Sequence, residues 1–177
     1  MKINIILITY NHSNYIRPAL ESILMQETSH NVEIIVADDC STDNTVEIIK
    51  EYESKTKFIF HYLHKGQNVG YIRNYQQAFA TCTGDYVAIM EGDDYWVKAS
   101  HLENHINHLE KIPNSSMSYN RHICLFEDQH REETFDWTLD TDYELITTDQ
   151  LALGNRIGNL SCCVFRGKYI QQLDPKL

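Results

Sequence analysis

Three carboxylates follow a short apolar run in the middle of the chain, and together they could hold a divalent cation. Residues 86–90 have the pattern of a strand buried on both faces, and Glu91, Asp93 and Asp94 come directly after it. Unpaired carboxylates are costly to bury, but a cleft with a hard cation tolerates them because divalent metals prefer oxygen ligands. Gly92 leaves the backbone free to bring the acids together. We therefore expect a cation and phosphate site here, and a solvated acidic turn is the alternative.

Polar residues with binding chemistry follow two other apolar runs. Asp39, after residues 32–37, could accept the N–H of a nucleobase, and Tyr10, after residues 3–9, could stack on that base. The structural alternatives are that Asp39 caps a helix and that Tyr10 is an ordinary aromatic side chain at the edge of the fold. Arg73 could bind a diphosphate through two hydrogen bonds, although a surface ion pair is the simpler interpretation of that residue alone.

The elements that must position these residues alternate between short apolar strands and amphipathic helices. Strands are expected over residues 3–9, 32–37, 58–63 and 86–90. This alternation predicts an α/β fold with a parallel sheet. The carboxyl ends of parallel strands lie at one edge of the sheet, so the polar turns that follow these strands can surround one ligand.

The second half of the chain is less regular. A strand is expected over residues 117–126 and a last strand over residues 160–166. Between them, residues 127–144 are acidic, aromatic and poorly periodic, which is typical of a hairpin or a flexible excursion. Thr147 is expected to cap a short helix that ends at Leu153.

The helix after the acid cluster raises two further expectations. Ser100 and Glu103 match the capping-box pattern at a helix start. Three histidines then lie along one flank of the helix, namely His101, His105 and His108. They could bind zinc, but Leu102 stands where a zinc protease has its glutamate, so a polar helix flank is the favoured interpretation.

The composition limits the partners and the compartment. The 177 residues suit one domain, and the net charge of −10 argues against nucleic acid, because binding phosphates needs a basic stripe. No apolar run approaches the roughly 20 residues of a membrane-spanning helix. Five cysteines without a CxxC spacing fit free thiols in a reducing compartment. We therefore expect a cytoplasmic protein that does not span a membrane, with association at the inner membrane face left open.

Four motifs, each at an expected strand end or helix start, occur in the order and spacing of family 2 glycosyltransferases with the GT-A fold. They are Thr9-Tyr10-Asn11, Asp38-Asp39-Cys40-Ser41-Thr42-Asp43-Asn44-Thr45, Asn68-Val69-Gly70 with Arg73-Asn74, and Glu91-Gly92-Asp93-Asp94. Each motif alone is weak, but four in order are specific. The resemblance extends to about Trp96 and continues more weakly to Arg166. It implies a Rossmann-like, mostly parallel central sheet with helices on both faces.

This resemblance also implies an activity. Family members transfer a sugar from a nucleotide-diphosphate donor, with UDP-sugars favoured here, to a glycan or lipid-linked acceptor. They usually invert the anomeric centre with the help of Mn²⁺ or Mg²⁺, and a role in bacterial-type surface polysaccharide or glycan synthesis follows. Residues at matching positions that resemble donor-binding residues are Thr9, Tyr10, Asn11, Asp39, Asn68, Arg73, Glu91 and Asp93. Asp93 and Asp94 resemble the metal-binding carboxylates, and Glu91 replaces the usual first aspartate of the acid motif.

The resemblance further predicts how one domain over residues 1–177 is divided. Residues 1–112 would form the donor half and residues 113–177 part of the acceptor half. In relatives the catalytic base is an aspartate beyond the strand that resembles residues 160–166, so we expect the base beyond Leu177 in a domain that is truncated here. If the base lies within the chain, the acids to consider are Asp140, Asp142, Glu144 and Asp149.

Two other function classes stay open. A nucleotidyltransferase shares the open sheet and the metal, but it usually needs a loop rich in glycine and basic residues after the first strand, and residues 10–15 contain neither. A non-catalytic module that binds nucleotide sugars or carbohydrates would fit a domain without a catalytic base.

Overall fold

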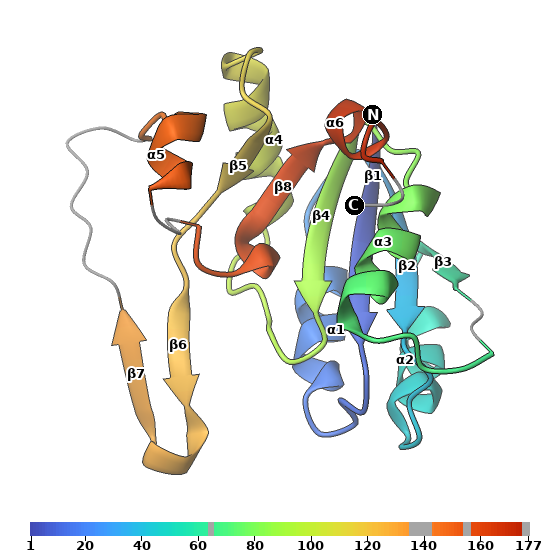
Figure 1. Ribbon diagram of the computed structural model, residues 1–177. Helices are drawn as coiled ribbons and strands as arrows, with labels where there is room; N and C mark the ends of the chain where they lie inside the picture. The colour runs from blue at the N-terminus through green and yellow to red at the C-terminus, as the bar shows by residue number, and fades with distance from the viewer. Residues whose placement is uncertain (64–65, 135–142, 154–156, 175–177) are drawn as a thin grey trace.

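A six-stranded sheet forms the centre of the computed structural model, which describes residues 1–63, 66–134, 143–153 and 157–174 (Figure 1). The strands of this sheet are β1 (Lys2–Thr9), β2 (Asn31–Asp38), β3 (Ile59–Tyr62), β4 (Tyr86–Glu91), β5 (Met117–Tyr119) and β8 (Cys163–Arg166). Their order is β3-β2-β1-β4-β8-β5. The first four strands are parallel, whereas β8 is antiparallel to β4 and β5 is antiparallel to β8. The expected mostly parallel sheet is confirmed.

The register of the parallel strands brings their carboxyl ends together. Thr9 of β1 pairs with Asp38 of β2, and Ile8 of β1 pairs with Glu91 of β4. Strands β1 and β4 are apolar and almost fully buried, which explains the continuous apolar runs in the sequence. The four predicted strands of the first half match the observed ones to within one residue at each end.

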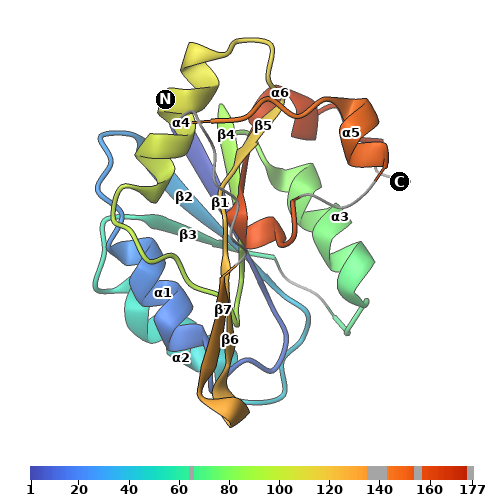
Figure 2. The same cartoon turned by 90° about the vertical axis from the view of Figure 1, so that its left-hand side faces the viewer.

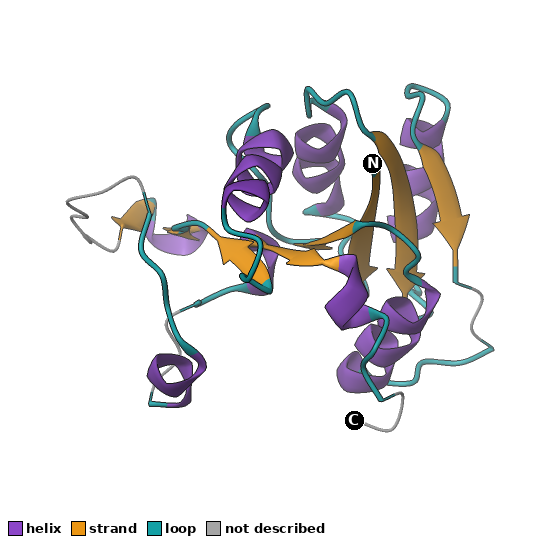
Figure 3. Cartoon of the chain, turned by 90° about the horizontal axis from the view of Figure 1, so that it is seen from above, coloured by secondary structure: helices purple, strands orange, loops and turns teal. Residues whose placement is uncertain are grey.

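Helices cover both faces of the sheet, as expected (Figure 3). The helices are α1 (Ile16–Leu24), α2 (Thr45–Glu53), α3 (Tyr71–Thr81), α4 (His101–Lys111), α5 (Thr148–Ala152) and α6 (Gly167–Ile170). Helices α1, α2 and α4 pack in one buried cluster with Leu7, and α3 and α6 pack in another with Ile6. Successive side chains of β1 point to opposite faces, so one strand contributes to both clusters.

The predicted strand over residues 117–126 is divided into two. Strand β5 ends at Tyr119, and β6 (Ile123–Phe126) pairs with β7 (Arg131–Thr134) in a separate hairpin. The hairpin stands apart from the central sheet in Figure 1 and lies in front of it in the turned view of Figure 2. The reason lies in the facing segment, because β8 is preceded by a 3-10 turn, η2 (Leu160–Cys162), which cannot continue a strand ladder. For the same reason the last strand begins at Cys163 rather than at residue 160. The hairpin therefore begins before the acidic segment of residues 127–144. Residues 135–142 of that segment lie outside the described part of the chain.

One of the two predicted helix caps is confirmed. Thr147 forms a capping box with Gln150 at the start of α5. The predicted box at the start of α4 is wrong, because the carboxylate of Glu103 accepts a hydrogen bond from Thr28 at 2.7 Å and Ser100 makes no side-chain cap bond. A tertiary contact has replaced the local one.

The interpretation of the α4 histidines as a polar flank is wrong for two of them. His101 and His105 are 7% and 4% exposed. The His101 ring stacks on Trp96 with ring centroids 4.3 Å apart, and its Nε2 has no hydrogen-bond partner among the described residues. The ring nitrogens of His105 lie 2.9 Å from Ser118 Oγ and 2.9 Å from Asn120 Oδ1. Burial lowers the pKa of His101 to about 3 and also lowers the pKa of His105, so both rings are neutral at pH 7.

We predict that the free energy of unfolding decreases as pH is lowered from 7 to 5. His101 titrates near 6.5 when unfolded and at about 3 when folded, so in this window the unfolded state binds more protons. The contribution of this residue is at most about 1.4 kcal/mol per pH unit. Urea denaturation at several pH values measures the slope. His101→Phe keeps a ring on Trp96 and should reduce the slope. Equal slopes for His101→Phe and the unsubstituted protein would contradict the prediction.

Candidate functional site

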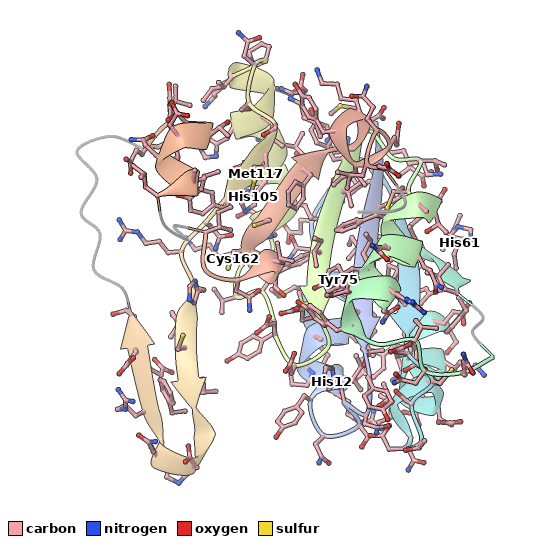
Figure 4. All side chains as sticks on the ribbon, viewed as in Figure 1. His12, His61, Tyr75, His105, Met117 and Cys162 are labelled. Atoms are coloured by element: carbon pink, nitrogen blue, oxygen red, sulfur yellow. The ribbon has the colours of Figure 1, made fainter. Side chains whose placement is uncertain are left out.

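The polar turns after β1, β2 and β4 meet at one edge of the sheet. Strand order changes direction at β1, with β2 and β3 on one side and β4 on the other. In open α/β sheets, ligands bind outside the carboxyl ends of the strands at such a switch point. The edge lies at the lower end of the sheet in Figure 1, and His12, labelled in Figure 4, marks the turn after β1.

The acid motif forms a tight turn directly after β4. The Asp94 N–H donates to the Glu91 carbonyl at 3.0 Å, and the Gly92 N–H donates to a carbonyl of β1 at 2.8 Å. A Cβ at Gly92 would lie 2.6 Å from His12 Nδ1 and 2.9 Å from Thr9 Oγ1. The absence of a side chain at Gly92 therefore lets the acid turn pack against the turn after β1.

Glu91 is held by two tyrosines of α3. The hydroxyls of Tyr71 and Tyr75 donate to Glu91 Oε1 at 3.0 and 2.8 Å. Burial raises the pKa of both phenols, and the nearby charge of Glu91 raises them further, so both remain protonated donors. Tyr75 is 6% exposed, whereas Tyr71 is 60% exposed at the sheet edge. Glutamate has a longer side chain than aspartate, and this length lets the Glu91 carboxylate reach the tyrosines of α3.

Asp93 and Asp94 present carboxylate oxygens at this edge. The Asp93 side chain is 54% exposed, with Oδ2 4.0 Å from His12 Nε2. Asp94 Oδ2 accepts hydrogen bonds from Asn159 Nδ2 at 2.8 Å and from Ser161 Oγ at 2.7 Å. In the part of the chain that the structure describes, no three His, Cys, Asp or Glu side chains are grouped so that they could hold a metal alone. The two acids nevertheless fit Mg²⁺ or Mn²⁺ shared with phosphate, because one or two carboxylates plus substrate phosphates suffice for such ions.

Asp39 organises the loop before α3. Its carboxylate accepts the N–H groups of Val69 at 2.9 Å and Gly70 at 2.8 Å, and its carbonyl accepts a hydrogen bond from Asn68 Nδ2 at 2.9 Å. Gly70 has a φ of 86°, which favours glycine. Asp39 is 3% exposed, and each of its carboxylate oxygens accepts one of these backbone N–H groups. The structure thus brings Asp39 and Asn68 together.

The turn after β1 is locked to the turn after β2. Asn11 adopts a φ of 55°, its Oδ1 accepts the N–H of Thr42 at 2.7 Å, and its own N–H donates to Ser41 Oγ at 2.9 Å. Thr9 is 1% exposed, so its hydroxyl faces the protein interior. Tyr10 is 45% exposed and is available to stack on a ring. Among these three residues, Tyr10 is the one placed to touch a ligand, while Thr9 and Asn11 support it.

Arg73 lies in the first turn of α3, on the side of the helix that faces away from Glu91. It lies on the outward face of α3, where it lines a shallow surface hollow with Gln76 and Gln77. Residues two positions apart on a helix point in nearly opposite directions, so Arg73 faces away while Tyr71 and Tyr75 face Glu91. Contact between Arg73 and a diphosphate stays a prediction.

Several residues of the site were missed by sequence reasoning. His12 and Tyr71 lie beside predicted motifs, and the spacing of Tyr71 and Tyr75 by one helical turn is a signal that could have been used. Asn159 and Ser161 are 65 and 67 residues from Asp94 along the chain, and no local pattern marks them.

No described residue is assigned as the catalytic base. Asp140 and Asp142 lie outside the described residues, and Glu144 and Asp149 are exposed. Among the described helices, none has the length and apolar character needed to cross a bilayer.

Comparison with known sequences identifies relatives of this chain. The sequence profile of glycosyl transferase family 2 matches residues 4–173. An uncharacterised protein of Mycobacterium tuberculosis is 33% identical over 132 residues, which cover 75% of this chain and 38% of that protein. The putative teichuronic acid biosynthesis glycosyltransferase TuaG of Bacillus subtilis is 35% identical over 96 residues, 54% of this chain and 37% of that protein. The chain thus spans less than two fifths of the length of these relatives.

Solved structures share the fold. The crystal structure of S. aureus TarS 1–349 in complex with UDP-GlcNAc has a TM-score of 0.55 and 27% identity, covering 66% of this chain and 33% of TarS 1–349. The mannosyltransferase PcManGT of Pyrobaculum calidifontis, in complex with GDP-Man and Mn²⁺, has a TM-score of 0.59 and 22% identity over 68% of this chain and 35% of its own.

We predict that Gly92→Ala destabilises the protein by about 1–3 kcal/mol, the usual cost of overpacking. The added methyl group would meet His12 and Thr9 within 3 Å. Gly66→Ala is the matched control, since a Cβ there has nothing within 4 Å and Gly66 does not have a positive φ. Urea denaturation measures both free energies of unfolding, and equal stabilities of the two variants would show that the acid turn is not packed as described.

Proposed function

Because the chain belongs to glycosyl transferase family 2, we propose that the protein transfers a sugar from a nucleotide-diphosphate-sugar donor to a hydroxyl group of an acceptor. The main support is the convergence of Tyr10, Asp39 and the acid turn at the switch point between β1 and β4. In this proposal residues 1–112 form the donor half, and residues 113–177 contribute part of the acceptor half.

A UDP-sugar is the proposed donor. TarS, at 27% identity, binds UDP-GlcNAc, which supports uracil as the base. The exposed ring of Tyr10 would stack on the base, and Asp39 would accept its N–H while it holds the loop that contains Asn68. The second oxygen of Glu91, whose first oxygen accepts both tyrosine hydroxyls, would accept a sugar hydroxyl.

Asp93 and Asp94 would hold Mn²⁺ or Mg²⁺ against the diphosphate. When bound, such an ion stabilises the negative charge that grows on the leaving group. The chain itself fixes the two carboxylates on one hydrogen-bonded turn and keeps Asp93 exposed. Fixed groups aimed at the developing charge need little reorganisation during the reaction, which favours the transition state.

The proposed reaction inverts the anomeric centre. The acceptor hydroxyl oxygen attacks the anomeric carbon from the face opposite the diphosphate, the bond between that carbon and the diphosphate oxygen breaks, and its electron pair leaves with the diphosphate. A carboxylate takes the hydroxyl proton. The acceptor is proposed to be a glycan or a lipid-linked saccharide at the cytoplasmic face of a membrane. The proposed role is surface polysaccharide synthesis, which the name of the relative TuaG, a putative teichuronic acid biosynthesis glycosyltransferase, supports.

We predict that the full-length protein releases UDP from a UDP-sugar only when Mn²⁺ or Mg²⁺ and an acceptor are present. Asp94→Asn should lose Mn²⁺-dependent UDP binding and turnover while the fold is retained, because one metal-binding charge is removed. Titration calorimetry and turnover of labelled UDP-sugars measure the two effects. Asp128→Asn, at an exposed acid of the hairpin turn, is the control. Mn²⁺-dependent binding that persists in Asp94→Asn would refute the metal assignment, and binding without any turnover would favour a non-catalytic module.

We also predict that UDP binds about 5- to 150-fold more tightly than CDP. Uracil offers an N3–H to Asp39, whereas N3 of cytosine is an acceptor, and a hydrogen bond lost against a buried group costs about 1–3 kcal/mol. Changing the ligand rather than the residue leaves the Asp39 bonds to Val69 and Gly70 intact. Competition between the two nucleotides measures the ratio, and equal affinities would exclude Asp39 as the base acceptor.

A further inference from the structure

Asp94 is oriented by residues from the other half of the chain. We propose that Asn159 and Ser161 are positioning residues that fix the Asp94 carboxylate so that one of its oxygens faces the metal-bound diphosphate. This inference rests on the proposed function and names two residues that no motif of the donor half contains.

The hydrogen bonds to Asp94 are unequal for its two oxygens. Asn159 Nδ2 and Ser161 Oγ both donate to Oδ2, at 2.8 and 2.7 Å. A carboxylate oxygen has two lone pairs, so Oδ2 is fully used. No residue in the described ranges donates to Oδ1. The arrangement therefore holds the carboxylate in one orientation and leaves Oδ1 as the oxygen that can bind a cation.

The direction of each hydrogen bond follows from the other partners of the two residues. The Glu91 N–H donates to Ser161 Oγ at 2.9 Å, so the single hydroxyl proton of Ser161 is left for Asp94. The Ser161 N–H donates to Asn159 Oδ1 at 2.6 Å, so the NH₂ group of Asn159 must face Asp94. Both side chains are consequently fixed as donors, which is the role that an ionised carboxylate requires.

Backbone groups also hold η2 against the end of β4. Strands β4 and β8 pair through the ladder from Tyr86–Arg166 to Ala88–Val164. Trp96 Nε1 donates to the Ser161 carbonyl at 2.7 Å, which does not depend on the serine side chain. Backbone groups therefore supply part of the docking of η2, and the side chains of Asn159 and Ser161 add the bonds to the Ser161 and Glu91 N–H groups. This turn lies beside the end of β4 opposite Tyr75 of α3 (Figure 4, where Cys162 is the last residue of η2).

The test separates the metal-dependent part of nucleotide binding from the rest. Titration calorimetry measures the Kd of UDP with Mn²⁺ and with EDTA for the unsubstituted protein, Ser161→Ala and Asn159→Ala. We expect the Mn²⁺-dependent gain in affinity to fall about 10- to 100-fold in each variant, the usual effect of losing a residue that orients a metal ligand, with the Kd in EDTA unchanged. Ser161→Thr keeps the hydroxyl and should recover most of the gain.

Ser22→Ala is the matched control. Ser22 is 4% exposed, like Ser161, and its hydroxyl donates within α1 to the Ala19 carbonyl. It should lose none of the Mn²⁺-dependent gain. If Ser161→Ala does not fold, Asn159→Ala decides the question, since Asn159 is only partly buried.

The outcomes distinguish this inference from the proposed function. If the unsubstituted protein shows the gain, Asp94→Asn loses it and Asn159→Ala retains it, the inference alone is overturned. If Asn159→Ala and Ser161→Ala weaken binding equally with Mn²⁺ and with EDTA, their role is structural and the inference is again overturned. If the unsubstituted protein binds UDP without any Mn²⁺ dependence, both the metal role and the inference fail.

Discussion

The negative charge collected at the carboxyl edge of the sheet is the constraint on which the rest of the site depends. Carboxylates are costly to remove from water unless donors meet them. Here Asp39 is met by two backbone N–H groups, Glu91 by two tyrosine hydroxyls and Asp94 by an amide and a hydroxyl. These donors come from the loop before α3, from α3 itself, and from η2 with the residue that precedes it. The positions of three separate segments are thereby tied to the acids.

The same donors leave a defined set of free acceptors. Asp93 remains exposed, and Asp94 keeps one oxygen without a donor among the described residues. Tyr10 remains exposed because the turn that contains it is locked by Asn11 to the neighbouring turn. A site built in this way has its orientation set before a ligand arrives, which is the property that electrostatic stabilisation of a transition state requires.

Much of the site could be predicted because its parts follow strand ends, but the contacts of each residue could not. The order of motifs identified the edge and the acids on it. However, the sequence does not show that Thr9 and Asn11 face the protein, or that Arg73 lies on the outward face of its helix. Asn159 and Ser161 were missed because their partner is more than 60 residues away. Side-chain contacts between distant segments leave no periodic signal in the chain.

The sequence by itself determined the first four strands, their parallel arrangement and the edge where their polar turns meet, because burial on both faces demands continuous apolar runs. Only the tertiary structure decided the second half. There β5 is short because the segment opposite it is a 3-10 turn. The Glu103 side chain accepts a hydrogen bond from Thr28 instead of capping the start of its own helix. His101 and His105 have the polarity of a surface flank but are buried against Trp96 and β5, since packing rather than residue type fixes which helix face turns inward.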